Sequence, residues 1–291
     1  MTLQDILAEA TARLDAAHLA YGHGTTNAHD EAAWLVLWRL GLPLDTDLDD
    51  QGNKPVEDAD AQAVREVIAR RIETRKPAAY LTGEAWLQGV PFHVDERVIV
   101  PRSFIAELIA EGGFDAWLSP DTRHVLDLCT GNGSLAVLAA MAWPEIRVTG
   151  ADISPDALAV AHKNVALHGL QDRITLLESD GLARCPGPWD LILCNPPYVN
   201  AGSMAALPAE YRAEPEIALA GGDDGMDFVR NLFRDAPSRM SANAVMVLEI
   251  GNEKDHFEHV FPGLDVVWLS TSAGDEQVLL VTAESLRRFH A

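Results

Sequence analysis

From His124 onward, short apolar segments alternate with segments whose apolar residues recur at helical spacing. A glycine turn follows the first apolar segment, and Ser154 with Pro155 starts a helix after the second. This alternation is typical of a doubly wound α/β fold, in which helices cover both faces of one sheet. We expect seven strands at residues 125–129, 147–151, 174–177, 191–194, 244–250, 266–270 and 277–282, and helices at residues 104–111, 134–142, 155–168 and 226–240.

The first part of the chain has a different pattern. Apolar residues recur at helical spacing from residue 1 to about residue 77 and predict helices. Residues 86–100 then predict two short strands, with Gly89-Val90-Pro91 as the turn between them. We therefore divide the chain into an N-terminal helical domain (residues 1–85), a β-hairpin linker (residues 86–101) and a main α/β domain (residues 102–291).

The composition limits the possible sites and locations. Cys129, Cys185 and Cys194 are too few and too widely spaced for a disulfide framework or a Cys-x-x-Cys metal site. The ten histidines show no paired spacing, so we expect no bound metal. The start of the chain has no basic segment before an apolar core, and no run of about 18 apolar residues occurs. We expect no signal peptide, no membrane span and a cytoplasmic location.

The formal net charge of −22 also limits the choice of partner. A protein that holds nucleic acid by its phosphates normally has a basic face. A strongly acidic chain would have to build such a face against its own charge. The composition argues against nucleic acid as the substrate and favours a basic protein.

The first predicted strand leads into the segment 127–133, Asp-Leu-Cys-Thr-Gly-Asn-Gly, where a Rossmann-type ligand loop belongs. Gly131-x-Gly133-x-x-Ala136 satisfies the dinucleotide fingerprint, and Asp152 follows about 20 residues later, as a ribose-binding acid should. Both a nicotinamide cofactor and S-adenosylmethionine present a ribose diol to such an acid. This part of the chain therefore indicates a nucleoside-containing cofactor and leaves the two open.

The ends of the third and fourth strands separate these cofactors. Asp180 could accept a hydrogen bond from an adenine amino group, and Asn195-Pro196-Pro197-Tyr198 enters the same crevice. The Asn195 side-chain oxygen and the Pro196 carbonyl could each accept one N–H of a planar amine, while Tyr198 packs on its face. Such an array would fix the plane of the nitrogen and favour positive charge on it as a methyl group arrives. A hydride-transfer enzyme has no evident use for it, whereas a methyltransferase does.

Several motifs together resemble those of the N5-glutamine methyltransferases, which are S-adenosylmethionine-dependent enzymes with a seven-stranded Rossmann-like sheet. They are Tyr80-Leu81-Thr82-Gly83, Val100-Pro101-Arg102, the glycine loop, Asn195 to Tyr198, Glu214-Pro215-Glu216 and Gly221-Gly222-Asp223-Asp224-Gly225. The release-factor branch of this family tends to follow Pro-Arg with Pro and acidic residues. This chain has Arg102-Ser103-Phe104 and is most similar to the branch that methylates large-subunit ribosomal protein number three.

The resemblance implies a role for each matching residue. Cys129, Thr130, Gly131, Asn132 and Gly133 would border the methionine part of S-adenosylmethionine. Asp152 would hold its ribose, and Asp180 and Gly181 would flank its adenine. Asn195, Pro196, Pro197 and Tyr198 would hold the substrate glutamine, with Asn195 also beside the cofactor.

The resemblance also implies the partners. The substrate would be a basic ribosomal protein, with a release factor as the nearest alternative. An exocyclic amine of a flipped nucleobase is an alternative of another class, which the acidic composition disfavours. The N-terminal helices would recognise the substrate protein.

Arg102 has two interpretations: a contact with the cofactor carboxylate or an ion pair with Glu107.

Overall fold

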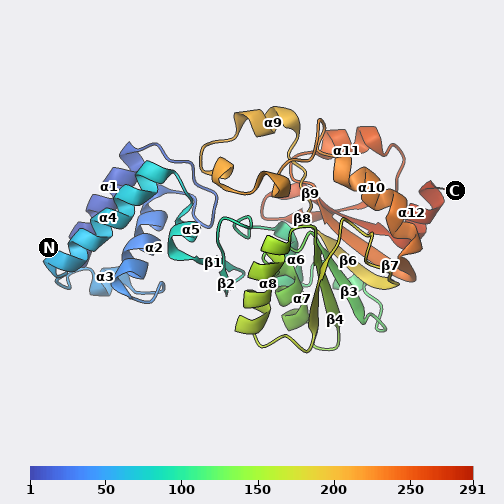
Figure 1. Cartoon of the computed structure of the whole chain (residues 1–291), viewed down its shortest axis with the longest axis horizontal. Helices are drawn as coiled ribbons and strands as arrows, with labels where there is room; N and C mark the ends of the chain where they lie inside the picture. Colours follow the sequence, from blue (N-terminus) through green and yellow to red (C-terminus); the bar gives the residue numbers. More distant parts are fainter. Residues whose placement is uncertain (291) are drawn as a thin grey trace.

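A computed structural model describes residues 1–290 and contains the predicted seven-stranded sheet (Figure 1). The strand order is β5-β4-β3-β6-β7-β9-β8. The strands from β5 to β7 pair in parallel, and β9 pairs antiparallel with both β7 and β8. The Rossmann-like fold is therefore confirmed. The bounds are β3 (His124–Leu128), β4 (Arg147–Asp152), β5 (Ile174–Glu178), β6 (Trp189–Cys194), β7 (Met240–Glu249), β8 (Val267–Thr271) and β9 (Gly274–Thr282).

Helices cover both faces of this sheet because successive strand residues point to opposite sides. In β6, Leu191 and Leu193 belong to one buried cluster, while Ile192 and Cys194 belong to the other. Each cluster is completed by its own helices. They are α6 (Phe104–Glu111), α7 (Ser134–Ala142) and α8 (Pro155–Leu167) on the first side, and α10 (Asp227–Asp235), α11 (Lys254–Val260) and α12 (Ala283–Phe289) on the second.

Local capping fixes where two of these helices begin. The Ser103 side chain accepts a hydrogen bond from the Ile105 N–H at the start of α6. Ser154 accepts from the Ala157 N–H at the start of α8, and Pro155 occupies the first helical position. Both helices begin where the sequence predicted. The helix expected at residues 226–240 is shorter, because α10 ends at Asp235 and a 3₁₀ turn, η4 (Ala236–Ser238), follows.

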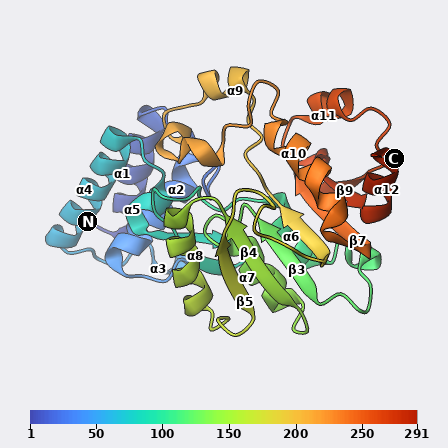
Figure 2. The same cartoon turned by 45° about the vertical axis from the view of Figure 1, so that its right-hand side comes forward.

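The N-terminal helices pack around a core of their own (Figures 1 and 2). Leu3, Leu14, Leu35 and Ile68 are each at most 1% exposed and belong to one cluster. The elements of this region are α1 (Leu3–Ala16), α2 (Ala28–Leu40), α3 (Leu48–Gln51), α4 (Asp58–Thr74) and α5 (Ala78–Thr82). No helix within residues 1–290 combines the length and the apolar character that crossing a membrane requires.

The predicted hairpin exists, but its turn lies elsewhere. Strands β1 (Glu84–Leu87) and β2 (Val90–His93) form a separate two-stranded sheet in which Trp86 pairs with Pro91. The turn is Gln88-Gly89, and both residues have positive φ, 50° and 73°. The prediction of Gly89-Val90-Pro91 was wrong because proline is compatible with an edge strand. Residues 94–100 follow the hairpin without forming a strand.

The segment between β6 and α10 is rich in Pro, Glu and Gly. It contains three short helical elements, α9 (Ala201–Ala206), η2 (Tyr211–Ala213) and η3 (Glu216–Ala218). In both views α9 lies above the sheet, and the chain that follows it runs next to the N-terminal helices (Figures 1 and 2). This segment therefore borders both parts of the molecule.

Candidate active site

The glycine turn joins the end of β3 to the start of α7, as the sequence predicted. The Thr130 hydroxyl donates to the Asp127 carboxylate beneath the turn, and the Thr130 N–H donates to the Ala151 carbonyl of β4. Gly133 is the N-cap residue of α7 and provides no side-chain cap. Hydrogen bonds to two neighbouring strands thus hold the turn in place, and the side that does not face these strands is left for a ligand.

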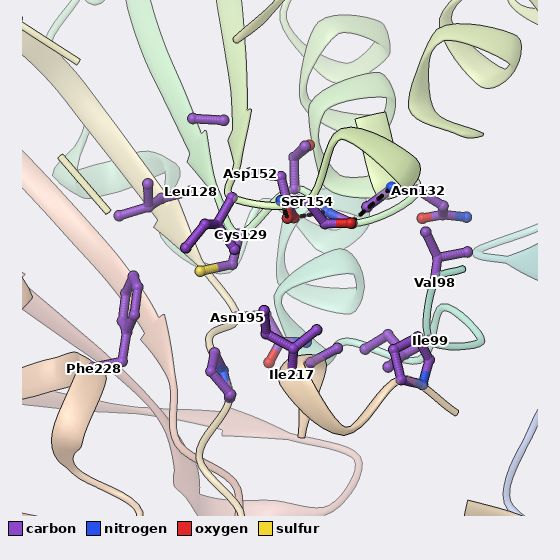
Figure 3. Close-up of a pocket in the computed structure, with 18 of the residues that line it drawn as sticks. Val98, Ile99, Leu128, Cys129, Asn132, Asp152, Ser154, Asn195, Ile217 and Phe228 are labelled. Atoms are coloured by element: carbon purple, nitrogen blue, oxygen red, sulfur yellow. Dashed lines mark hydrogen bonds between the residues drawn. The ribbon is translucent and has the colours of Figure 1, made fainter. Parts of the chain in front are cut away.

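Asp152 ends β4 next to this turn (Figure 3). Its Oδ2 accepts from the Gly131 N–H at 2.9 Å, and its Oδ1 accepts from the Ser154 N–H at 2.9 Å. Burial raises the pKa of the Asp152 carboxyl above its ordinary value, although these N–H donors act in the opposite direction. The carboxylate is therefore held in one orientation at the edge of a cavity, as a group that binds a diol must be.

A cavity of about 380 Å³ lies over the carboxyl ends of β3, β4, β5 and β6. This volume is within the usual range for small-molecule sites. Nine of the predicted residues line it: Cys129, Thr130, Gly131, Asn132, Asp152, Asp180, Gly181, Asn195 and Pro197. Three predicted residues do not line it: Gly133, Pro196 and Tyr198. The structure thus gathers residues from four strand ends into one cavity.

Asn195 reaches into this cavity from the end of β6 (Figure 3). Within residues 1–290 its amide forms no hydrogen bond, and the Pro196 carbonyl accepts none. Polar groups close to a protein interior are normally paired. The Asn195 amide, which the described chain leaves unused, is therefore available to a ligand in the cavity, while the unpaired Pro196 carbonyl lies outside the cavity lining.

Tyr198 turns away from the cavity toward the end of β7. Its hydroxyl donates to Glu249 Oε1 at 3.3 Å, and Glu249 Oε2 accepts from the Ser103 hydroxyl at 2.6 Å and the Phe104 N–H at 2.9 Å. Glu249 is 2% exposed, and burial raises its pKa. Tyr198 and Glu249 therefore join the Asn195–Tyr198 turn to the start of α6.

Gly225 explains why the motif 221–225 accompanies this turn. A Cβ at Gly225 would lie 2.3 Å from the Tyr198 carbonyl oxygen, and its φ is 78°. No side chain larger than hydrogen fits such an approach without displacing backbone. The glycine-rich motif therefore packs directly against the turn that carries Asn195.

Sequence reasoning missed several residues of the site. They include the apolar residues Val98, Ile99, Ile153, Ile217 and Phe228, which line the cavity, and all of these except Ile153 are labelled in Figure 3. Ile153 directly follows Asp152 and could have been found from that position. The other four lie on segments that fold back over the strand ends, and no local sequence pattern marks them.

Arg102 has a partner that neither interpretation named. Its guanidinium donates to both carboxylate oxygens of Glu214, at 2.6 and 2.7 Å. The expected ion pair with Glu107 is wrong, since Glu107 accepts instead from the N–H and hydroxyl of Ser272. Burial acts to raise the pKa of Glu214, but His23 and Arg102 outweigh it and lower that pKa to about 2. Arg102 and Glu214 are therefore an ion pair beside the cavity.

No group of three or more metal-ligating side chains occurs in the part of the chain that the structure describes. The carboxylates that line the cavity instead have the hydrogen-bond acceptors expected for an uncharged diol and an adenine amino group. A fixed carboxylate follows β4, Asp180 follows β5, and the glycine turn lines the cavity between β3 and α7. With the unused Asn195 amide after β6 in the same cavity, this Rossmann-like sheet has the groups expected of an S-adenosylmethionine-dependent methyltransferase.

Comparison with known proteins identifies the family within this class. Residues 114–212 match the methyltransferase small domain, and residues 5–83 match the PrmC N-terminal domain. The chain is 53% identical to the ribosomal protein uL3 glutamine methyltransferase of Bordetella pertussis, over 98% of this chain and 96% of that protein. The Burkholderia pseudomallei protein of the same name is 50% identical, over 98% and 95%. The chain belongs to the family of these glutamine methyltransferases, and the predicted cofactor, S-adenosylmethionine, is confirmed with it.

Solved structures agree on the fold. The hMettl16 catalytic domain in complex with MAT2A 3′UTR hairpin 1 matches with a TM-score of 0.51 and 14% identity. The match covers 80% of this chain and 83% of that one. At this identity the likeness supports the shared Rossmann-like architecture.

Proposed function

We propose that this protein transfers a methyl group from S-adenosylmethionine to the N5 atom of a glutamine side chain in ribosomal protein uL3. The observation that carries the proposal is the 53% identity to the Bordetella pertussis enzyme over 98% of this chain. That match includes both the N-terminal helices and the cavity. It therefore covers the surfaces through which the substrate and the cofactor would be recognised.

The cofactor would lie along the cavity over the strand ends. We assign its methionine part to residues 129–133, its ribose to Asp152, and its adenine to Asp180 and Gly181. These assignments are supported by the nine predicted residues that share one cavity and by the fixed Asp152 carboxylate. S-adenosylmethionine, when bound, supplies the methyl group.

The substrate amide would be held by the turn after β6. We assign the Asn195 side-chain oxygen and the Pro196 carbonyl as acceptors for the two N–H groups of the glutamine amide. An amide nitrogen is a poor nucleophile because its lone pair is delocalised into the carbonyl. Two fixed acceptors would orient the nitrogen and stabilise positive charge that develops on it. The unpaired state of both acceptors supports this role.

Pro197 and Tyr198 complete the proposed substrate site. Pro197 lines the cavity, while the Tyr198 hydroxyl contacts Glu249. This contact supports a positioning role for Tyr198, which keeps the turn in place. The packing of its ring on the substrate amide stays a prediction.

A basic partner agrees with the charge of the chain. The net charge of −22 would attract a basic ribosomal protein and slow the approach of nucleic acid. A cytoplasmic location, where such a substrate would be met, stays a prediction.

The proposal is tested with a cofactor labelled in its methyl group. The protein is incubated separately with uL3, a release factor and ribosomal RNA, and the modified residue is located by mass spectrometry. We expect the label on a glutamine of uL3. Label on the release factor alone would move the protein to the other branch of the family, and label in RNA alone would contradict a protein substrate.

A further inference from the structure

The segment 207–218, which we call the strap, connects α9 to the cavity. It is drawn in gold and orange between the N-terminal helices and the sheet (Figures 1 and 2). Pro215, Ile217 and Ala218, at its end, line the cavity. Ile217 is 59% exposed, so apolar packing does not account for the position of this wall. Its position must be set by other contacts of the strap.

Glu214 is the first of these contacts and is fully buried. Its Oε1 accepts from the Val100 N–H at 2.8 Å, in addition to the paired hydrogen bonds from Arg102. His23 Nε2, from the N-terminal domain, lies 3.5 Å from Glu214 Oε2. His23 is itself only 2% exposed. One carboxylate thus joins the strap to the linker and to the N-terminal domain.

Glu210 is the second contact, and its side chain is also fully buried. Arg75 Nε lies 2.8 Å from Glu210 Oε1, and Arg71 Nη1 lies 3.7 Å from the same oxygen. Neither pair has the alignment of a hydrogen bond. Arg71 is in turn held by Glu31, with 2.7 Å between Nε and Oε1. Both arginines belong to the N-terminal domain, so Glu210 contacts that domain and not the cavity.

Tyr211, between these two carboxylates, is packed against the same loop of the N-terminal domain. Its ring centroid lies 4.2 Å from that of His23, and its hydroxyl donates to the Tyr21 carbonyl at 3.4 Å. A Cβ at Gly22, whose φ is 127°, would lie 2.3 Å from the Tyr211 hydroxyl oxygen. Tyr211 can approach the backbone of this loop so closely because residue 22 is a glycine.

Buried carboxylates hold a segment more strictly than exposed ones do. Removing one partner of a buried ion pair leaves the other charge uncompensated in the interior, which is strongly unfavourable, so both partners together keep the segment in its observed position. The strap has two such carboxylates within five residues, and their cationic partners come from outside the strap. The N-terminal domain therefore contacts the strap at both carboxylates, through Arg75 at Glu210 and through His23 at Glu214, and Val100 and Arg102 also hold Glu214.

We propose that Glu210 and Glu214 are positioning residues, through which the N-terminal domain holds the strap as a wall of the cofactor cavity and thereby sets the affinity for the cofactor. The proposal rests on the proposed function for the identity of the ligand. It assigns to the N-terminal domain a second task besides contact with the substrate protein.

The test measures binding of S-adenosylhomocysteine by titration calorimetry, without any methyl acceptor. Glu210→Gln should weaken binding about tenfold, within the range usual for coupling between two sites. Hydrogen exchange within residues 207–218 should become faster in the same variant. The matched control is Glu9→Gln, which removes an ion pair with Arg65 (2.7 and 2.9 Å) inside the N-terminal domain and away from the strap. It should leave the affinity unchanged.

Arg75→Ala breaks the same contact from the other side, at a side chain that is 33% exposed. It should weaken binding to a similar degree, and the Glu210→Gln/Arg75→Ala double variant should lose no more than the stronger single variant. Unchanged affinity in either single variant, or fully additive losses, would overturn the proposal. If Glu210→Gln does not fold, Arg75→Ala decides alone. Because no substrate protein is used, a failure of the proposed substrate leaves this result unaffected.

Discussion

Asp127 offers a direct test of how the glycine turn is supported. It is 1% exposed and lies near the end of β3, where Oδ2 accepts from the Thr130 hydroxyl and from the Ala136 N–H at 2.9 Å. Its Oδ1 has no hydrogen-bond partner within residues 1–290. Burial raises the pKa of this carboxyl from 3.8 to about 7, although both hydrogen bonds act to lower it. Asp127→Asn removes the titration, while the side-chain oxygen can still accept both hydrogen bonds.

The sign of the effect follows from this pKa. The folded protein retains a proton on Asp127 between pH 3.8 and about pH 7, where the unfolded chain has lost it. The stabilising contribution is therefore complete below pH 3.8 and is lost as the pH rises to about 7. The two pKa values differ by about three pH units, each worth about 1.4 kcal/mol, which gives about 4 kcal/mol in total. Relative to the wild type, Asp127→Asn should gain about 1.4 kcal/mol per pH unit across this interval.

The measurement is urea denaturation of both proteins at several values from about pH 4.5 to pH 8. The difference in free energy of unfolding should change steadily up to about pH 7 and then stay constant. Asp190→Asn is the control. Although burial acts to raise the pKa of Asp190, the Arg123 and His124 N–H groups lower it below 3.8, so the difference between wild type and Asp190→Asn should stay constant across this pH range. A difference between wild type and Asp127→Asn that does not vary between pH 4.5 and 7 would refute the reasoning.

Three further predictions concern the turn after β6. Asn195→Ala should leave the affinity for S-adenosylhomocysteine unchanged and lower kcat about 10²–10³-fold, because the alignment of the nitrogen is lost. Unchanged turnover in steady-state assays would exclude this role for Asn195. Tyr198→Phe should lower the free energy of unfolding by about 1–3 kcal/mol, since buried Glu249 loses a donor. Gly225→Ala should be about 1–3 kcal/mol less stable than the control variant Gly263→Ala. Gly263 has a similar φ of 81°, but a Cβ there would meet nothing within 4 Å. Equal free energies of unfolding in urea would contradict the close approach of Gly225 to the Tyr198 carbonyl.

The sheet could be predicted from the sequence because its strands are local patterns. Apolar runs that end at a glycine turn, at Asp152 or at Pro196 indicate both the strand and the edge of the sheet at which it ends. Together with the family resemblance, this reasoning predicted twelve site residues, and nine of them line one cavity. Each strand and the residue at its end are determined by a local segment of a few residues. A parallel sheet then brings the ends of its strands together.

The contacts that hold the site could not be predicted in this way. Glu214 lies 112 residues from Arg102, and Glu249 lies 146 residues from Ser103. Each pair depends on how distant segments cross, and a charged residue has many possible partners along the chain. The proximity of Arg102 to Glu107 in sequence favoured the wrong pair. Glu107 instead contacts Ser272 at the turn between β8 and β9.

The rigidity of the Asn195–Tyr198 turn illustrates the same limit. Two prolines restrict φ at their own positions, and this alone predicts a stiff end to the strand. They do not determine which way Asn195 faces, because that depends on where the whole turn is attached. The attachment comes from Glu249 beneath Tyr198 and from Gly225 against the Tyr198 carbonyl. If these contacts orient the amide, Tyr198→Phe should lower kcat for methyl transfer more than it raises KM, although the ring does not line the cavity.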